Sequence, residues 1–181
     1  MPLIDRTYFI GEINIPNTNQ PAVQENIDYL IKKREPELLT QLFGYEMYKA
    51  FTTGLAAPTP EQRWLDLRDG VDYTDTDGLS RRWMGLVTKE AADPKQSLIA
   101  NYVYYWFTRK EATQSSGVGE VVTKTENSKR VSPISKQVRA WNEMVNWIWE
   151  LYDYLEAKEA DYPELEARNK CQWTILNPFN I

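Results

Sequence analysis

Apolar residues recur every three or four positions over much of this chain, a spacing typical of amphipathic helices. The first helix begins at Pro21, and we expect Pro36 to break or kink it, because proline has no backbone N–H. A second helix is predicted from Glu37 to Phe51. Gly44 lies inside that second helix, where a missing side chain favours close approach by another element.

Turn-forming residues mark the middle of the chain. Residues 54–60 contain one glycine and two prolines, which predict a loop. Residues 61–67 are predicted to form a short helix. The stretch 69–78 is rich in aspartate and glycine, so it predicts a small hairpin or a looped excursion. Residues 80–86 then bring Trp83 back to the core.

Two aromatic helices and the connection between them dominate the second half. The first spans 97–110 and is apolar nearly all round, so we expect it to be central. Pro133 opens the second, whose apolar stripe comprises Ile134, Val138, Trp141, Val145, Ile148, Tyr152 and Leu155. Residues 115–133 are too polar for a core and too long for a simple turn. They predict a long presented loop or small β-hairpin.

Both ends of the chain are predicted to be extended. Residues 3–16 alternate loosely, as an arm or edge strand would, and residues 171–181 carry apolar side chains that must dock on their own domain or on a neighbour. At 181 residues, we predict one mainly α domain, a bundle of about four to five helices. Its parts are an extended arm (1–18), a helical core (19–160) with a loop at 114–133, and an extended tail (161–181).

Composition narrows the chemistry. The chain is 42% hydrophobic, which supplies a core, and its net charge of −5 disfavours nonspecific nucleic-acid binding by the whole surface. It has no histidine, the commonest general base, and its one cysteine, Cys171, cannot form an internal disulfide. No apolar run approaches the roughly 18 residues that span a membrane, and the first residues lack the features of a signal peptide. We expect a soluble protein with no cofactor, no metal and no membrane association.

The acid-rich turn is the most enzyme-like feature. As in calcium-binding loops, alternating carboxylates precede a glycine, here Asp72, Asp75, Asp77 and Gly78. Aligning that glycine with the loop glycine of such sites puts Tyr73 and Met84 at two essential ligand positions. A solvated turn that uses aspartate and glycine for their backbone preferences is therefore the better interpretation.

Other candidates for catalysis are weaker. Nothing in the sequence places two carboxylates across a cleft, although pairs could come from Asp66, Asp69 and Asp72, or from Glu37 and Glu46. The pair Gly117 and Gly119 lacks the third glycine of a dinucleotide fingerprint. We therefore predict that the chain is not an enzyme.

The connection between the aromatic helices is locally basic in an acidic protein. Residues 120–136 contain two acidic side chains, Glu120 and Glu126. They contain four cationic ones: Lys124, Lys129, Arg130 and Lys136. These could contact phosphates or an acidic partner surface. The alternative is a solvated hairpin whose charges only keep it soluble.

Spaced aromatic and glycine motifs cover roughly residues 20–155. They are Leu42–Phe51, Trp64–Gly70 with Tyr73, Trp83–Leu86, Ser97–Phe107, Gly117–Gly119, Asn127–Pro133, and Lys136 followed by Trp141–Val145. Together they resemble a family of small tailed-phage proteins, found in phages and prophages of Bacteroides-type bacteria, that act as head–tail connectors. The shared motifs are structural rather than catalytic.

The resemblance implies a helical adaptor of the virion neck, assembled in the host bacterial cytoplasm as a ring of commonly about twelve copies beneath the portal protein. Such a ring would extend the DNA channel, pass DNA without sequence-specific binding, and dock further neck or tail proteins. The loop facing the channel or portal would include Gly117, Gly119, Lys124, Lys129, Arg130 and Lys136. Candidates for the interface between subunits are Tyr8, Phe9, Trp147, Trp149, Trp173 and Phe179.

Two other functions stay open at this stage. The chain could be a monomeric helical protein-binding module in a bacterial cell, acting through its aromatic face. It could also be a carboxylate-dependent enzyme that uses the cluster between Asp66 and Asp77. The connector is our preferred hypothesis, chiefly because of the resemblance to that family. The aromatics, the terminal segments and the presented loop also suit an assembly.

Overall fold

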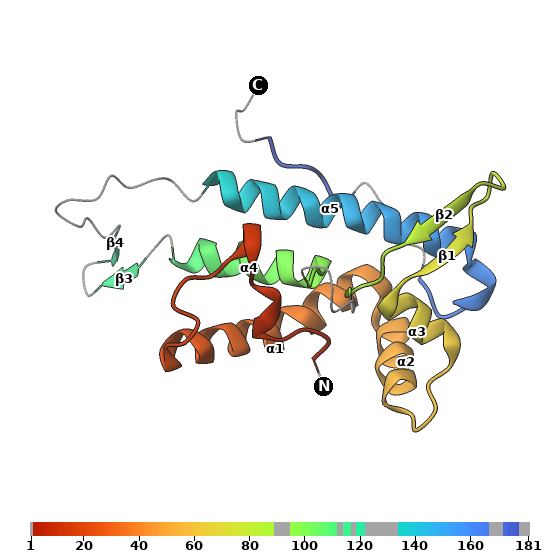
Figure 1. Ribbon diagram of the computed structural model, residues 1–181, viewed down its shortest axis with the longest axis horizontal. Coiled ribbons are helices and arrows are strands. Elements are labelled where there is room, and N and C mark those ends of the chain that lie inside the picture. Colours follow the sequence, from red (N-terminus) through yellow and green to blue (C-terminus); the bar gives the residue numbers. More distant parts are fainter. Residues whose placement is uncertain are drawn as a thin grey trace.

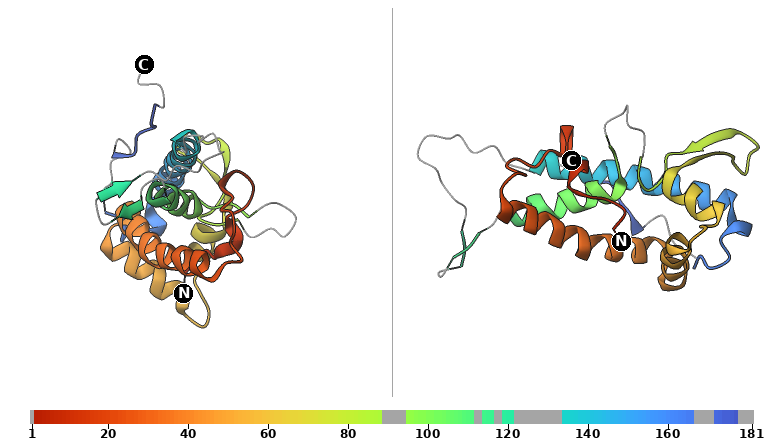
Figure 2. Two further views of the ribbon diagram at one scale, coloured as in Figure 1. Left: turned by 90° about the vertical axis from the view of Figure 1, so that its left-hand side faces the viewer. Right: turned by 60° about the horizontal axis from the view of Figure 1, so that its bottom comes forward.

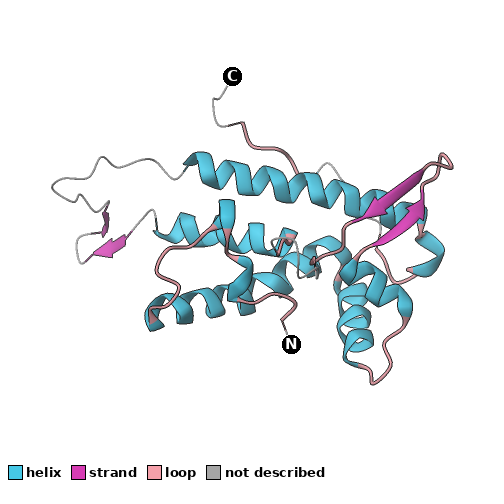
Figure 3. Cartoon of the chain, in the orientation of Figure 1, coloured by secondary structure: helices cyan, strands magenta, loops and turns pink. Residues whose placement is uncertain are grey.

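The structure is a computed structural model that describes residues 2–88, 95–111, 114–116, 119–121, 134–166 and 172–177. Helices dominate these residues, which confirms the predicted mainly α class (Figure 3). Three helices lie in the first half and two in the second: α1 (Pro21–Phe43), α2 (Tyr45–Ala56), α3 (Gln62–Asp69), α4 (Leu98–Glu111) and α5 (Ile134–Ala157). Two small antiparallel sheets lie at opposite ends of the elongated bundle: β1 (Val71–Thr74) with β2 (Ser80–Trp83), and β3 (Gln114–Ser116) with β4 (Gly119–Val121) (Figure 1).

We expected Pro36 to break or kink the first helix. Helix α1 continues through Pro36, so the predicted break is wrong. Proline removes one intrahelical hydrogen bond, but buried residues on both sides of it, including Ile31 and Leu38, pack into one core. The chain turns instead at Gly44, which separates α1 from α2 with φ of 84°. Residues with a side chain rarely adopt that backbone conformation, so the position of this glycine explains where the long helix ends.

A close approach of another element to a glycine is found at Gly54. A Cβ atom at Gly54, in α2, would lie 2.2 Å from Nε1 of Trp64 in α3. The missing side chain lets the indole sit directly against the helix, where it is 1% exposed. Its ring meets Phe51 edge-on at 5.9 Å between centroids. This contact fixes α3 against α2.

Strands β1 and β2 form the small hairpin predicted for the acid-rich stretch. Val71 pairs with Trp83 and Thr74 with Ser80. The Trp83 ring is fully buried, and its Nε1 donates a hydrogen bond of 3.0 Å to the backbone oxygen of Leu67. The hairpin is therefore tied to the end of α3 by a buried side chain.

Helix α4 is central, as its apolar residues predicted. It packs on α1 and, most extensively, on α5 (Figure 2). Leu98, Ile99 and Val103 are fully buried. The stripe on α5 is buried from Val145 onwards, whereas Ile134, at its start, is 56% exposed. Among the described residues, no helix combines the length and apolar character needed to cross a membrane.

The N-terminal segment differs from the predicted extended arm. It folds into two short 3-10 turns, η1 (Arg6–Tyr8) and η2 (Gly11–Ile13), that pack against α1, α4 and α5. At the other end, α5 is followed by η3 (Glu159–Asp161), and residues 172–177 lie extended beside α5. The sequence left open whether the tail docks on its own domain, and this part of it does.

Candidate functional site

The predicted contact loop lies mostly outside the described residues. Gly117, Lys124, Lys129 and Arg130 belong to that undescribed part of the connection. Gly119 begins β4, opposite Ser116 of β3. Lys136 is exposed on the first turn of α5. The structure thus places this basic residue at the start of α5, the point where the connection from α4 ends.

Two of the predicted subunit-interface residues are buried inside their own domain. Tyr8 is 6% and Phe9 2% exposed, so neither ring is available to a second copy in this conformation. The reason is local folding: a short turn at η1, capped by the Asp5 carboxylate accepting from the Thr7 N–H, directs both rings inward. Loose alternation in the sequence could not distinguish this turn from a strand.

The other interface candidates gather around α5. Trp147 and Trp149 are half-buried, and Trp173 of the tail is 8% exposed. Phe179 lies outside the described residues. The indole N–H of Trp147 is buried without a hydrogen-bond partner within the described part of the chain. These rings contact the core of their own domain.

Aromatic rings link α4 to α5 at the end where the connection leaves the bundle. The Tyr105 and Trp141 rings have centroids 4.9 Å apart. Beside them, Trp106 carries the Arg34 guanidinium 3.7 Å from its ring centroid and the Arg109 guanidinium 5.3 Å from it. Cations over an indole face are attracted by the negative charge of the π-system. This end of the bundle is therefore stiffened by stacked side chains.

A cleft of about 480 Å³ opens between η2, α4 and α5. Its lining includes the buried Asn101 side chain, the unpaired Trp147 indole N–H, and two α5 carboxylates, Glu143 and Glu150. Burial raises the pKa of both glutamates, and the neighbouring charge of Glu12 adds to the effect at Glu143. Lys95 lines the same cleft, so charges of both signs lie beside the amide and indole donors.

A second cleft, of about 650 Å³, is mostly apolar and contains a buried carboxylate. Glu35 of α1 is 6% exposed and accepts hydrogen bonds from the Leu3 N–H at 2.9 and 3.0 Å and from the Ile4 N–H at 3.4 Å. Burial raises the pKa of Glu35 from 4.5 to about 7, and the backbone donors only partly offset it. This side chain holds the N-terminal segment on the bundle.

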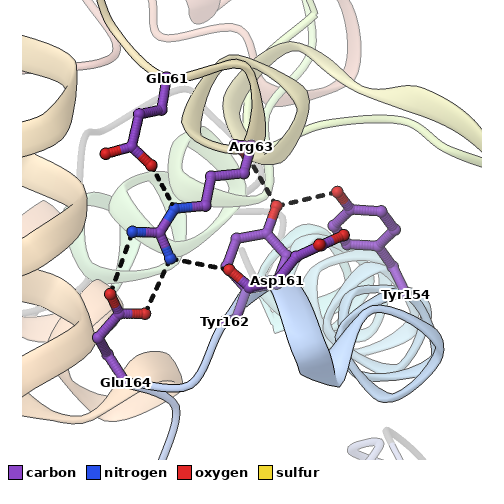
Figure 4. Close-up of polar contacts among 6 residues, drawn as sticks. All are labelled: Glu61, Arg63, Tyr154, Asp161, Tyr162 and Glu164. Atoms are coloured by element: carbon purple, nitrogen blue, oxygen red, sulfur yellow. Dashed lines mark hydrogen bonds and ion pairs between the residues drawn. The ribbon is translucent and has the colours of Figure 1, made fainter.

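A polar network fixes the segment after α5 to α3 (Figure 4). The Arg63 guanidinium donates to Glu61 at 2.8 Å, to both carboxylate oxygens of Glu164 at 3.0 and 3.1 Å, and to the backbone oxygen of Asp161 at 2.8 Å. It also stacks 4.1 Å from the ring centroid of Trp64. Partial burial acts to raise the pKa of Glu164, but the Arg63 hydrogen bonds hold it below its ordinary value. Sequence reasoning missed this network, because its halves lie far apart along the chain.

Two buried tyrosines continue the network into the core. The Tyr162 hydroxyl donates to the backbone oxygen of Arg63 at 2.8 Å and lies 2.9 Å from the Tyr154 hydroxyl. Burial raises the pKa of Tyr154 to about 12 and that of Tyr162 further still. Both therefore stay neutral at physiological pH and act as hydrogen-bonding groups, not as bases.

The acid-rich turn uses its central carboxylate internally. Asp75 accepts hydrogen bonds from the Asp77 and Leu79 N–H groups at 3.0 and 2.8 Å, and from Arg81 Nε at 2.6 Å. The Arg81 hydrogen bond, with the turn amides, lowers the pKa of Asp75. These contacts agree with the interpretation of this stretch as a solvated turn rather than a calcium-binding loop. Within the described residues, no group of three or more acidic or cysteine side chains could hold a metal ion.

The carboxylates considered for acid–base work have separate partners. Asp66 accepts from Gln62, Asp69 from Arg68, and Asp72 from Arg82. Glu37 pairs with Arg34 at 2.7 Å on α1, and Glu46 lies exposed at the start of α2. Each of the paired groups is matched with a neighbouring side chain rather than with a second carboxylate across a cleft.

One contact set on α5 binds the backbone of the C-terminal segment. The Asn142 side chain donates to the Leu176 oxygen at 3.0 Å and accepts from the Leu176 N–H at 2.8 Å. The Trp141 indole donates to the Thr174 oxygen at 2.9 Å, and the Trp149 indole to the Trp173 oxygen at 3.2 Å. Asn142 was not among the predicted site residues. The one hint of its role in the sequence is that it directly follows Trp141 of the apolar stripe.

No protein-family model, curated protein or solved structure matches this chain. The geometry of the described residues therefore carries the functional argument, together with the motifs in the sequence. That geometry consists of a rigid α4–α5 pair, a connection leaving one end of it, and a face of α5 that binds an extended segment.

Proposed function

We propose that this chain is a structural head–tail connector of a tailed-phage virion. Copies of it would form a ring beneath the portal protein, extend the DNA channel and dock neck or tail proteins. The observation that carries the proposal is the arrangement of α4 and α5. These two helices pack along each other, and the C-terminal end of α4 lies at the same end of the bundle as the N-terminal end of α5 (Figure 1).

This arrangement suits the presentation of a loop to a large partner. The contact between the tilted rings of Tyr105 and Trp141 and the cations on Trp106 stiffen the ends of α4 and α5 that flank the connection. A rigid base reduces the conformational entropy that a loop loses when it binds. The surplus of positive charge in residues 120–136 would then be placed against phosphates or an acidic surface of the portal.

The motifs that resemble the connector family are consistent with a scaffold. Their aromatic residues Phe43, Phe51, Trp64 and Trp83 are at most 1% exposed and lie in one core. Such positions hold a fold together and leave the function to surfaces. We propose no enzymatic activity, no cofactor and no sequence-specific DNA contact, in keeping with carboxylates that are each paired with neighbouring donors.

The test is assembly with the portal protein of the virion to which this chain would belong. The two purified proteins are mixed, and light scattering and electron micrographs are compared with those of each alone. We expect rings of this chain attached to the portal. If the chain stays monomeric in the mixture and micrographs show bare portals, the connector proposal fails, and a monomeric protein-binding module becomes the better explanation.

A charge-reversal pair tests the role of the connection. Replacing both Lys129 and Arg130 by glutamate should weaken attachment to the portal by about tenfold or more, because like charges would face each other. The double variant Lys33→Glu and Lys49→Glu, on the exposed surfaces of α1 and α2, changes the net charge equally, is the matched control and should leave attachment unchanged. Equal loss in both variants would mean that overall charge, not the connection, governs binding.

A further inference from the structure

One face of α5 recognises the backbone of an extended chain. Asn142 satisfies the N–H and the carbonyl oxygen of the same residue, Leu176, at 2.8 and 3.0 Å. A carboxamide can do this because it carries a donor and an acceptor side by side. The indole N–H groups of Trp141 and Trp149 take two more carbonyl oxygens of the same segment. All four hydrogen bonds are made to main-chain atoms.

One side chain of the segment supplies the apolar contact. The Trp173 ring is 8% exposed and lies 6.1 Å from the Trp141 ring, centroid to centroid. The two apolar side chains that follow are much more open, with Ile175 48% and Leu176 36% exposed. Docking within one chain thus covers the tryptophan but leaves both aliphatic side chains in water. A neighbouring molecule could cover them.

We propose that Trp141, Asn142 and Trp149 form a binding site for an extended peptide, and that its ligand in the assembly is residues 172–177 of a second copy. Backbone hydrogen bonds and one indole contact do not require that the segment belong to the same chain. Each copy has one such site and one such segment, so exchange gives a head-to-tail contact that repeats around a ring. This inference deepens the proposed function, since its ring closure rests on the connector assembly.

Effective concentration decides which copy supplies the segment. In a free monomer the tethered segment has a local concentration of about millimolar, so it occupies its own site. Copies held side by side bring a second segment equally close, and exchange then gains the burial of Ile175 and Leu176 against the neighbour. The isolated chain is therefore expected to be monomeric, with its site filled by its own segment.

The test uses two complementary full-length variants. Leu176→Pro removes the N–H that donates a hydrogen bond to Asn142 Oδ1. The segment of this variant therefore binds more weakly, while its binding site is intact. Asn142→Leu removes the site while the segment is intact. Mixed together, the two should associate at least about tenfold more tightly than either does with itself, measured by sedimentation velocity.

Matched controls exist for both changes. Ile175→Pro removes an N–H that makes no hydrogen bond within the described residues. Asn146→Leu changes the same residue type one turn further along α5, where the side chain is exposed. This control pair should not associate. If it associates as well as the test pair, or if the folded test pair stays monomeric, the inference is overturned.

A peptide experiment covers the case in which a variant folds poorly. A fluorescent peptide with the sequence of residues 172–177 should bind the Leu176→Pro chain at least about tenfold more tightly than the wild-type chain, whose site is filled. Equal or absent binding to both chains would refute the site. No portal protein is present in either experiment, so failure of segment exchange and failure of connector assembly are seen separately.

Discussion

Replacing Glu35 by glutamine tests whether a buried carboxylate makes the stability of this fold fall near neutral pH. Glu35 is 6% exposed, and its burial raises the pKa from 4.5 to about 7. Between these values the folded chain binds more protons at this site than the unfolded chain does. The free energy of unfolding therefore falls as the pH rises from about 4.5, and it levels off above about 7.

The magnitude follows from the size of the shift. One pKa unit corresponds to about 1.4 kcal/mol, so the contribution of Glu35 changes by about 3 kcal/mol between pH 4 and pH 8. Glutamine has no charge and keeps one oxygen for the Leu3 N–H, at a cost of about 1 kcal/mol for the lost second acceptor. We expect Glu35→Gln to be slightly less stable than wild type at pH 4.5 and more stable at pH 8.

The assay is urea unfolding, followed by tryptophan fluorescence, at several pH values from 4.5 to 8. The decisive quantity is the difference in unfolding free energy between variant and wild type, because it cancels the titration of other groups. Glu46→Gln, at an exposed position of α2, is the control for the loss of a carboxylate and should not make the chain more stable than wild type at pH 8. A Glu35→Gln difference that is constant across this range would refute the reasoning.

Two further predictions concern packing at α3. Gly54→Ala should lower the unfolding free energy by about 1–3 kcal/mol in spite of the better helix propensity of alanine, because the new Cβ would lie 2.2 Å from the Trp64 indole. Its cost should shrink in a Trp64→Phe background, as a double-mutant cycle by thermal or urea unfolding would show, and an unchanged cost would contradict the contact. Tyr162→Phe should cost about 1–3 kcal/mol, because it leaves the Arg63 carbonyl oxygen and a buried tyrosine hydroxyl without their partner. Tyr29→Phe, at a ring that is 56% exposed, is the control in the same unfolding assay and should be nearly neutral.

Local patterns predicted the elements whose causes are local. The apolar surround of α4 indicated a central helix, and the aspartate and glycine residues between Val71 and Ser80 indicated a hairpin. The prediction at Pro36 failed because it weighed one missing hydrogen bond without the burial on both sides. A local penalty of that kind is outweighed when neighbouring turns share one core.

The N-terminal segment shows the same limit from the other direction. Its loose alternation could describe a strand or a turn, and the choice depended on the Glu35 carboxylate 32 residues away from Leu3. A buried acceptor for two backbone N–H groups lets the segment fold back on α1. The sequence of the segment alone does not reveal that Glu35 is its partner.

Local sequence patterns were enough to predict that this protein is mainly helical, that α4 is central, and that a long connection joins two aromatic helices. These follow from residue spacing and turn chemistry, which act over a few residues. Two contacts became apparent from the packed helices alone. The Trp64 indole packs directly against Gly54, and Asn142 binds the backbone of Leu176, 34 residues further along the chain. Such contacts are made between surfaces that meet after the helices have packed, so their partners cannot be read from the neighbourhood of either residue.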